Sequence, residues 1–318
     1  GRPEERGVVA SASYEARALG VHSAMPTYRA LALCPEAIVR PNRHSLYRDY
    51  SRRVMAILHE ASPLVEQMSI DEAYLDLSDQ IEAWAGGVDL ARQIQARVRD
   101  EVGLSASLGV AGNKLVAKVA SDHDKPGGLT VVEPGQEAAF LAPLPVRVLW
   151  GVGPVTAGKL AELGVETVGD LARLAEADLE AHFGGQGAAL AQQARGIDRR
   201  PVVAEHELKS VSQERTFRRD LADLRALKQQ LWQLSQGVAR RLEGAEVAAG
   251  TVAIKLRYAD FATVTRQMSL AVPTADAEAI YGAALVLLRR TWQPGQPVRL
   301  LGVAGQRLCP PPGQLPLL

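Results

Sequence analysis

The segment QMSIDEAYLDL, residues 67–77, decides the fold of this chain, because it places two adjacent carboxylates, Asp71 and Glu72, between apolar residues. Acidic residues are poor strand formers, and an anion buried without a partner is strongly disfavoured. Neighbouring side chains of a strand point to opposite faces, so both carboxylates can reach one ion only where the backbone turns, as at the end of a hairpin. We therefore expect a turn at this pair and a positive group beside it.

The chemistry of the acidic pair favours a divalent cation. Two unit charges about 4 Å apart repel by roughly 4 kcal/mol at an effective dielectric near 20, which a divalent ion offsets. Ligands that offer only oxygen favour Mg²⁺, with phosphates of a substrate completing its coordination. The competing interpretation is an acidic pair at a strand end that faces solvent, and the pair alone does not decide between the two.

Upstream, the segment VVASASYEAR, residues 8–17, predicts an apolar strand that leads into a helix, with Ser11 and Ser13 as possible caps. Tyr14 and Arg17 are three residues apart and therefore share a helix face, where a hydroxyl and a guanidinium can reach one phosphate group. A surface stacking contact is the alternative for this pair.

Downstream, residues 105–110 predict a strand and the segment GNKLVAKVASD, residues 112–122, predicts a helix with its apolar residues inward. Lys114 and Lys118 share an edge of that helix, which in most proteins is a solvated face. A turn at residues 124–128 then holds Lys125 in a loop before a strand at residues 129–132.

Taken in order, these segments resemble the Y-family of translesion DNA polymerases, most closely the DNA polymerase IV type. The resemblance runs through nearly the whole chain and rests on three motifs. The first two are VVASASYEAR at 8–17 and SIDEAYLD at 69–76. The third is NK at 113–114 followed by AK at 117–118, ASD at 120–122 and KP at 125–126. It implies an α+β fold, a right hand of palm, fingers and helical thumb, with an added little finger domain.

The resemblance also implies roles for site residues. Asp71 would bridge two Mg²⁺ ions, and Glu72 would hold the ion that activates the primer 3′-hydroxyl. The incoming dNTP would be held by Ser11, Tyr14, Arg17 and Lys125. These residue types suit phosphoryl transfer, which depends mostly on positioning and on neutralisation of charge.

One departure from the family concerns the start of the chain. In the family the palm opens with a strand that carries a further metal-binding Asp, followed by aromatic residues that exclude ribonucleotides. This chain begins after that point, with GRPEER at residues 1–6. We therefore expect the parent protein to be a polymerase and this polypeptide alone to have little or no activity.

Charge is distributed unevenly along the chain. The 36 basic and 36 acidic residues give a formal net charge of +0. Residues 208–318 hold 15 Lys plus Arg against 8 Asp plus Glu, which leaves +7 there and −7 in residues 1–207. A basic last third can hold DNA phosphates, while the acidic remainder can house metal-binding carboxylates; charge asymmetry without function is the alternative.

Composition restricts the class of protein further. At 318 residues with 47% hydrophobic content, the chain predicts two to four globular domains, and no apolar run approaches the roughly 18 residues of a membrane span. The cysteines Cys34 and Cys309 show no disulfide or metal-ligand spacing. We expect a cytoplasmic monomer without a membrane partner or a zinc site.

The segment VRVLWGVGPVTAGKLAELGV, residues 146–165, looks like a helix-hairpin-helix motif. Gly151 and Gly153 would let backbone N–H groups approach a DNA phosphate at the start of a helix, with Lys159 as a second phosphate contact. We expect Val155, Leu160 and Leu163 to pack inward. The alternative for Gly-x-Gly before a helix is an ordinary tight turn.

After a linker at 201–209, the pattern of residues 210–308 predicts the order β-α-β-β-α-β, which resembles the little finger domain. Alternation in residues 251–258 turns Lys255 and Arg257 away from the core. We expect Lys255, Arg257 and Arg266 to lie on one sheet face and contact DNA; a merely solvated sheet face is the alternative.

The chain ends in a proline-rich segment, CPPPG, followed by QLPLL at residues 314–318. These last residues look like the peptide by which bacterial polymerases bind the sliding clamp, with Gln314, Leu315, Leu317 and Leu318 as contacts. An extended tether of this kind would raise the effective concentration of the enzyme at DNA. A Pro/Leu-rich tail without a partner is the alternative.

The sequence therefore predicts a template-directed DNA polymerase that uses two Mg²⁺ ions, primer–template DNA, dNTP and a sliding clamp. The expected domains are fingers 1–43, palm 44–132, thumb 133–200, linker 201–209, little finger 210–308 and tail 309–318. The first alternative is a non-catalytic accessory protein that binds DNA and the clamp. A structural DNA-binding module is the second, and it leaves Asp71, Glu72, Tyr14 and Arg17 unexplained.

Overall fold

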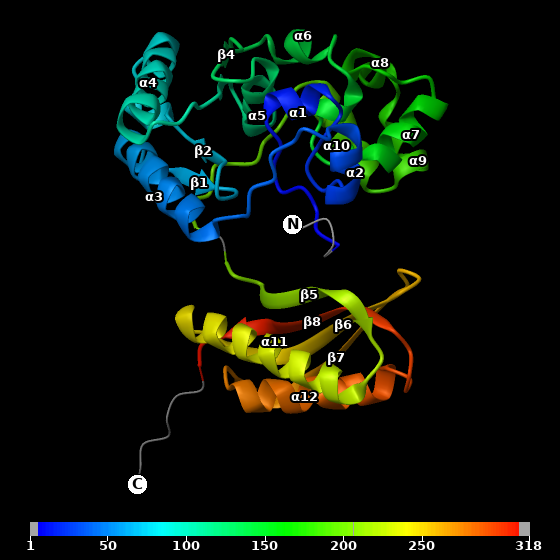
Figure 1. The fold of residues 1–318 in the computed structure, drawn as a ribbon. Coiled ribbons are helices and arrows are strands. Elements are labelled where there is room, and N and C mark those ends of the chain that lie inside the picture. The colour runs from blue at the N-terminus through cyan, green and yellow to red at the C-terminus, as the bar shows by residue number, and fades with distance from the viewer. Residues whose placement is uncertain (1–5, 206, 312–318) are drawn as a thin grey trace. The chain divides into compact units, whose positions relative to one another are not determined.

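The computed structural model describes residues 6–205 and 207–311. The chain divides into two compact units, one made of residues 43–206 and the other of the segments on either side of it. Figure 1 traces the elements of each unit along the chain. Among the helices of the described ranges, none has the length and apolarity needed to cross a bilayer.

The first part of the 43–206 unit combines two small sheets with three long helices. In chain order its elements are α3 (His44–Ala61), β1 (Val65–Gln67), β2 (Ala73–Leu75), the 3-10 turn η2 (Ser78–Gln80), α4 (Trp84–Arg97), the π-helical turn η3 (Val98–Val102), β3 (Leu108–Val110), α5 (Lys114–His123) and β4 (Leu129–Val131). Strands β1 and β2 form an antiparallel hairpin, while β3 and β4 pair in parallel. Helices α3 and α4 share one core with β1, built on residues such as Leu58, Val65 and Ile94.

The acidic pair lies in the turn that joins β1 to β2. The N–H groups of Met68 and Ser69 both donate to the carbonyl of Glu72, at 2.9 and 3.2 Å, and so close the turn. Asp71 and Glu72 are both exposed. The predicted turn at this pair is confirmed.

Residues 137–194 are helical, as predicted for a thumb. The elements are α6 (Glu137–Leu141), η4 (Val146–Val148), α7 (Pro154–Glu162), α8 (Val168–Arg173), α9 (Glu176–Phe183) and α10 (Gln186–Ala194). One expectation is wrong: Val155 is 78% exposed, whereas Leu160 is fully buried. Five residues at about 100° per residue place these two side chains about 140° apart around α7, so they cannot share its buried face.

Residues before 43 contain two short helices, α1 (Tyr14–Ala18) and α2 (Thr27–Leu33), with a small core of Val21, Met25 and Ala30. The predicted strand before α1 is reduced to an isolated bridge between Val8 and Pro26. Because Pro26 has no N–H group, a longer ladder cannot form there.

Residues 210–309 form a four-stranded sheet with two helices. The elements are β5 (Ser210–Leu221), α11 (Leu224–Gly244), β6 (Ala248–Tyr258), β7 (Thr263–Thr274), α12 (Ala277–Thr291) and β8 (Val298–Cys309). The predicted β-α-β-β-α-β order is confirmed, and the strand order β5-β8-β6-β7 is antiparallel throughout.

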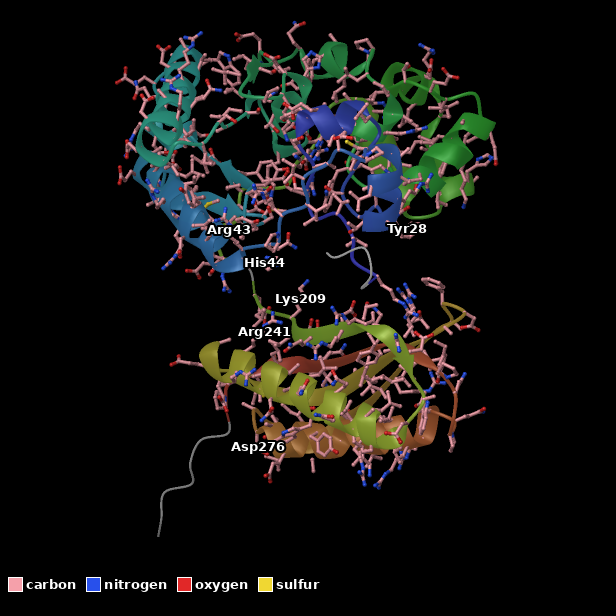
Figure 2. All side chains as sticks on the ribbon, in the orientation of Figure 1. Tyr28, Arg43, His44, Lys209, Arg241 and Asp276 are labelled. Carbon is pink, nitrogen blue, oxygen red and sulfur yellow. The ribbon has the colours of Figure 1, made fainter. Side chains whose placement is uncertain are left out.

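Both helices of this domain cover the same face of its sheet (Figure 1). Along α11 the side chains of Leu227, Leu231, Val238 and Leu242 are fully buried against the sheet. Asp276, labelled in Figure 2, caps α12 by accepting from the N–H of Ala279 at 2.7 Å. The burial of this stripe leaves the opposite sheet face free of helices.

Gly109 allows α5 to lie directly on β3, because a Cβ at this position would be 2.1 Å from the carbonyl oxygen of Ala117. We expect Gly109→Ala to lower the free energy of unfolding by about 1–3 kcal/mol, since α5 must move outward. Gly158→Ala, in open space within α7, is the matched control and should be neutral or stabilising by up to about 1 kcal/mol. Denaturant unfolding checks both, and equal stability of the two variants would contradict the close packing.

Candidate active site

Asp71 is held at the hairpin turn by Ser69. The Ser69 hydroxyl donates to Oδ1 of Asp71 at 2.6 Å, and the N–H of Asp71 donates back to the Ser69 oxygen at 3.2 Å. These local bonds fix the turn without burying the carboxylate. The acidic pair is therefore presented to solvent on a short, closed turn.

Glu72 has a positive partner, Lys118, in the middle of α5. Nζ of Lys118 donates to Glu72 at 2.7 Å and to Asp122 at 3.0 Å. Burial by itself lowers the pKa of Lys118, but the hydrogen bonds to Glu72 and Asp122 outweigh it and raise the pKa above its ordinary value. Lys118 is therefore the positive group expected beside the acidic pair.

Asp122 continues this chain of charges to Lys125. Nζ of Lys125 lies 2.5 Å from the Asp122 carboxylate, and the Lys125 side chain remains 41% exposed. Partial burial raises the pKa of Asp122, but the hydrogen bonds from Lys125 and Lys118 outweigh it, so that the pKa lies below its ordinary value. The order Glu72, Lys118, Asp122, Lys125 forms a run of alternating charges, called the charge ladder below.

The predicted dNTP contacts Ser11, Tyr14 and Arg17 belong to the other unit. All three are exposed, and Ser13 caps α1 by accepting from Ala16 N–H at 3.4 Å. Tyr14 and Arg17 share a face of α1, and Arg17 Nε donates to the carbonyl of Ala12 at 3.0 Å. The structure brings Asp71, Glu72 and Lys125 into one unit, while the approach of α1 to them stays a prediction.

The predicted helix-hairpin-helix residues lie at the start of α7. Gly151 has φ 86°, a left-handed conformation that favours glycine, and Gly153 is the extended residue that precedes Pro154 at the first turn. Within the described part of the chain, neither glycine N–H donates a hydrogen bond. Lys159 is exposed on the same helix, so the geometry suits a phosphate contact.

The open face of the little finger sheet carries Lys255 and Arg257 but not Arg266. Lys255 donates to Glu214 at 2.9 Å, and Arg257 donates to the Thr263 hydroxyl at 2.8 Å. Arg266 is paired directly with Ile254, which is buried against the helices.

Directly opposed residues of antiparallel strands share a face, so the expected grouping of Lys255, Arg257 and Arg266 on one face is wrong. Arg266 lies on the helix-covered side, at the exposed edge strand β7. The residues that do share the open face on β7 are polar, namely Thr263, Thr265, Gln267 and Ser269.

Two predictions remain, the contacts with the sliding clamp and the metal site. The predicted clamp contacts Gln314, Leu315, Leu317 and Leu318 lie outside the described residues. In the ranges that the structure describes, no three His, Cys, Asp or Glu side chains form a metal-binding group. Any ion at Asp71 and Glu72 therefore needs oxygen ligands from beyond this pair.

Three family models match the chain. Residues 1–122 match the impB/mucB/samB family, residues 208–317 match its C-terminal domain, and residues 147–198 match the thumb domain of DNA polymerase-iota. The DNA polymerase IV of Desulfatibacillum aliphaticivorans is 45% identical over 311 residues, which are 98% of this chain and 78% of that protein. This chain belongs to the Y-family of DNA polymerases, of the DNA polymerase IV type.

Other Y-family members agree with this assignment. The DNA polymerase IV of Halorhodospira halophila is 46% identical, over 98% of this chain and 87% of that protein. The solved Y-family chimera Dbh-Dpo4(243-245)-Dbh has a TM-score of 0.85 at 28% identity, covering 96% of this chain and 89% of that one. The insertion ternary complex of Dbh DNA polymerase has a TM-score of 0.67 at 27% identity, over 96% and 88% of the two chains. The predicted family, the α+β fold class and the assignment as a DNA-directed DNA polymerase are confirmed.

Sequence reasoning missed Lys118, Asp122 and Ser69 as parts of this Y-family site. The sequence of α5 does contain a pattern that could have indicated these residues. Positions 114, 118 and 122 are charged and four residues apart, and therefore form one stripe along the helix. The stripe was expected to be solvated. Instead it faces the hairpin that bears the acidic pair.

We expect Asp122→Asn to raise KM for the incoming nucleotide about three- to tenfold with kcat changed less than about twofold, because Lys118 and Lys125 lose a shared anion worth about 1 kcal/mol. Asp124→Asn, at an exposed neighbour with no ion pair among the described residues, is the control. Steady-state primer extension, carried out in this chain preceded by the N-terminal segment of the Halorhodospira relative, separates the two constants. A fall in kcat alone, or an equal effect of both variants, would rule out this role for Asp122.

Proposed function

We propose that this chain serves the copying of template DNA past damaged bases, in which a nucleotide is transferred from dNTP to a primer 3′-hydroxyl with two Mg²⁺ ions, and that these 318 residues alone have little or no activity. Members of the Y-family use divalent metal ions. The observation that carries the proposal is the exposed Asp71–Glu72 pair, held on a closed turn by Ser69 and balanced by Lys118. An acidic pair that is exposed and already fixed in position offers a divalent ion two oxygen ligands at little cost in reorganisation.

The residues fit a divalent ion. Asp71 and Glu72 are adjacent, exposed and offer only oxygen, the ligand type that Mg²⁺ prefers, and phosphates of dNTP can complete the coordination. When bound, two such ions neutralise the triphosphate and stabilise the attacking and leaving oxygens. Lys118 limits the repulsion within the pair when fewer cations are present.

The contacts proposed for the triphosphate are cations and hydroxyls. Lys125, positioned by Asp122, supplies one cation, while Ser11, Tyr14 and Arg17 of α1 supply hydroxyls and a guanidinium. All of them are exposed and therefore available to a ligand. Their roles are positioning and charge neutralisation, which suits phosphoryl transfer.

DNA is held without reading its sequence. The amides near Gly151 and Gly153, with Lys159, contact one stretch of backbone phosphates, and Lys255 and Arg257 contact another. The Dbh neighbour in an insertion ternary complex supports DNA and nucleotide as the partners. The peptide at 314–318 docks onto a sliding clamp and offsets weak DNA affinity.

The accessory-protein alternative is favoured by one observation, namely that Lys118 already neutralises Glu72. In that case the acidic pair is part of a structural ion network, and the chain binds DNA without catalysis. The unaltered protein would then bind primer–template DNA but would not extend the primer.

Primer extension with Mg²⁺ tests the proposal in the 318-residue chain and in this chain preceded by the N-terminal segment of the Halorhodospira relative. We expect Asp71→Ala to slow extension at least about 100-fold, equivalent to roughly 3 kcal/mol of transition-state stabilisation, with unchanged primer–template affinity. Asp79→Ala, at an exposed acid near the same hairpin, is the control and should retain full activity.

Extension by the joined form and not by the shorter one is the outcome that the sequence predicts. Absence of extension in every form, with primer–template binding intact, would overturn catalysis in favour of the accessory protein.

A further inference from the structure

Glu66 and Lys114 form an ion pair that is almost fully buried. The Glu66 side chain, in the middle of β1, is 3% exposed, and the Lys114 side chain, at the start of α5, is 10% exposed, with Nζ and Oε2 2.5 Å apart. The desolvation of two buried charges offsets much or all of their mutual attraction, so such a pair is weak evidence for a role in stability. The position of this pair therefore calls for another explanation.

Both charges also bind the chain that leaves the thumb. The N–H of Val203 donates to Oε2 of Glu66 at 3.0 Å, and Nζ of Lys114 donates to the carbonyl of Pro201 at 3.0 Å. One carboxylate oxygen thus joins α5 and the start of the linker. Residues 204, 205 and 207–209 make no hydrogen bond within the described part of the chain.

The pair also touches the hairpin that carries Asp71 and Glu72. Glu66 is registered directly opposite Tyr74 in the β1–β2 ladder, and Nζ of Lys114 lies 5.1 Å from the centre of the Tyr74 ring. A cation over an aromatic face at this distance is attractive. The linker start is consequently bonded to the base of the hairpin whose turn bears the acidic pair.

Two other contacts at the start of α5 bind residues 196–198, at the end of the thumb, and do not extend into the linker. Nδ2 of Asn113 donates to the carbonyl of Gly196 at 2.8 Å, and the N–H of Leu115 donates to Asp198 at 3.1 Å. Asp198 in turn holds Arg200 through two bonds of 2.8 Å. These contacts reach residue 200, whereas among the residues that the structure describes, hydrogen bonds from the Glu66–Lys114 pair extend the attachment to Pro201 and Val203.

We propose that Glu66 and Lys114 are positioning residues that anchor residues 201–203 to the active-site hairpin and so set the length of free chain before the little finger domain. The consequence for DNA affinity rests on the proposed function; the anchoring itself does not. Release of residues 201–203 would lengthen the stretch of sequence between the last attached residue and β5, which begins at Ser210, from about six to about nine residues. Because effective concentration falls roughly as the −3/2 power of tether length, DNA affinity should fall about twofold.

The test removes both charges at once. In Glu66→Leu/Lys114→Met, apolar side chains replace the ion pair, a change that often leaves stability intact, while Val203 and Pro201 lose their partners. Hydrogen exchange of the Val203 amide is measured by mass spectrometry on the full chain, and primer–template affinity by fluorescence anisotropy. We expect Val203 to exchange at least about tenfold faster and DNA to bind about twofold more weakly.

Two further variants separate anchoring from a purely structural role. Lys114→Arg keeps a charged donor for both Glu66 and Pro201, so its exchange and affinity should lie closer to those of the unaltered chain than the double variant's do. Arg92→Met removes an exposed ion pair with Asp89 on α4 and should change neither quantity. Unfolding midpoints of all variants show whether the fold is kept, and if the double variant does not fold, Glu66→Met/Lys114→Leu, a second pair without a buried charge, is measured in its place.

Unchanged exchange of Val203 in the double variant would overturn the anchoring, and faster exchange with unchanged DNA affinity would overturn its effect on tether length. If the unaltered chain bound no primer–template, the proposed function would fail while the exchange measurement still decided whether residues 201–203 are anchored.

Discussion

The charged stripe of α5 is the constraint on which the rest of the 43–206 unit depends. Lys114, Lys118 and Asp122 are four residues apart and therefore lie on one face, each about 6 Å farther along the helix than the last. Lys114 binds Glu66 and the linker, Lys118 binds Glu72, and Asp122 binds Lys125. Gly109 makes this possible, because the absence of a side chain there lets α5 lie against β3. A single helix thus holds the linker start, the acidic pair and Lys125 at defined points along its length.

The two ends of this stripe differ in burial, and the difference matches their proposed tasks. At Lys114 the charges are almost fully enclosed, which suits a fixed attachment that binds no substrate. At Lys118, Asp122 and Lys125 the side chains are 28 to 47% exposed, and so remain accessible to phosphates and ions. Ion pairs as exposed as these contribute little to stability, so the value of the charge ladder lies in orienting Lys125 and limiting repulsion between Asp71 and Glu72.

Sequence patterns predicted most of the fold because they report local constraints. Two adjacent acids predict a turn at Asp71. The apolar period of α11 and the alternation of apolar and charged residues in β6 predict the helix and the strand of the little finger domain. Patterns failed where the outcome depended on distant partners. For Lys114 the general alternative of a solvated face stayed open, because nothing local shows that Glu66 lies opposite it. Arg266 was grouped with Lys255 because the pairing of β7 with β6, which sets its face, is not encoded in β7 alone.

The central claim is that Asp71 and Glu72 hold a divalent ion beside the charge ladder. Its most direct test replaces Mg²⁺ with Fe²⁺ in the presence of primer–template and dNTP, and maps the backbone cuts made by the hydroxyl radicals that bound iron generates. The account predicts cuts within residues 68–75 and near residues 118–125, suppressed by added Mg²⁺ and absent in Asp71→Ala. Cuts elsewhere in the chain, or cuts at the hairpin that persist in Asp71→Ala, would contradict it.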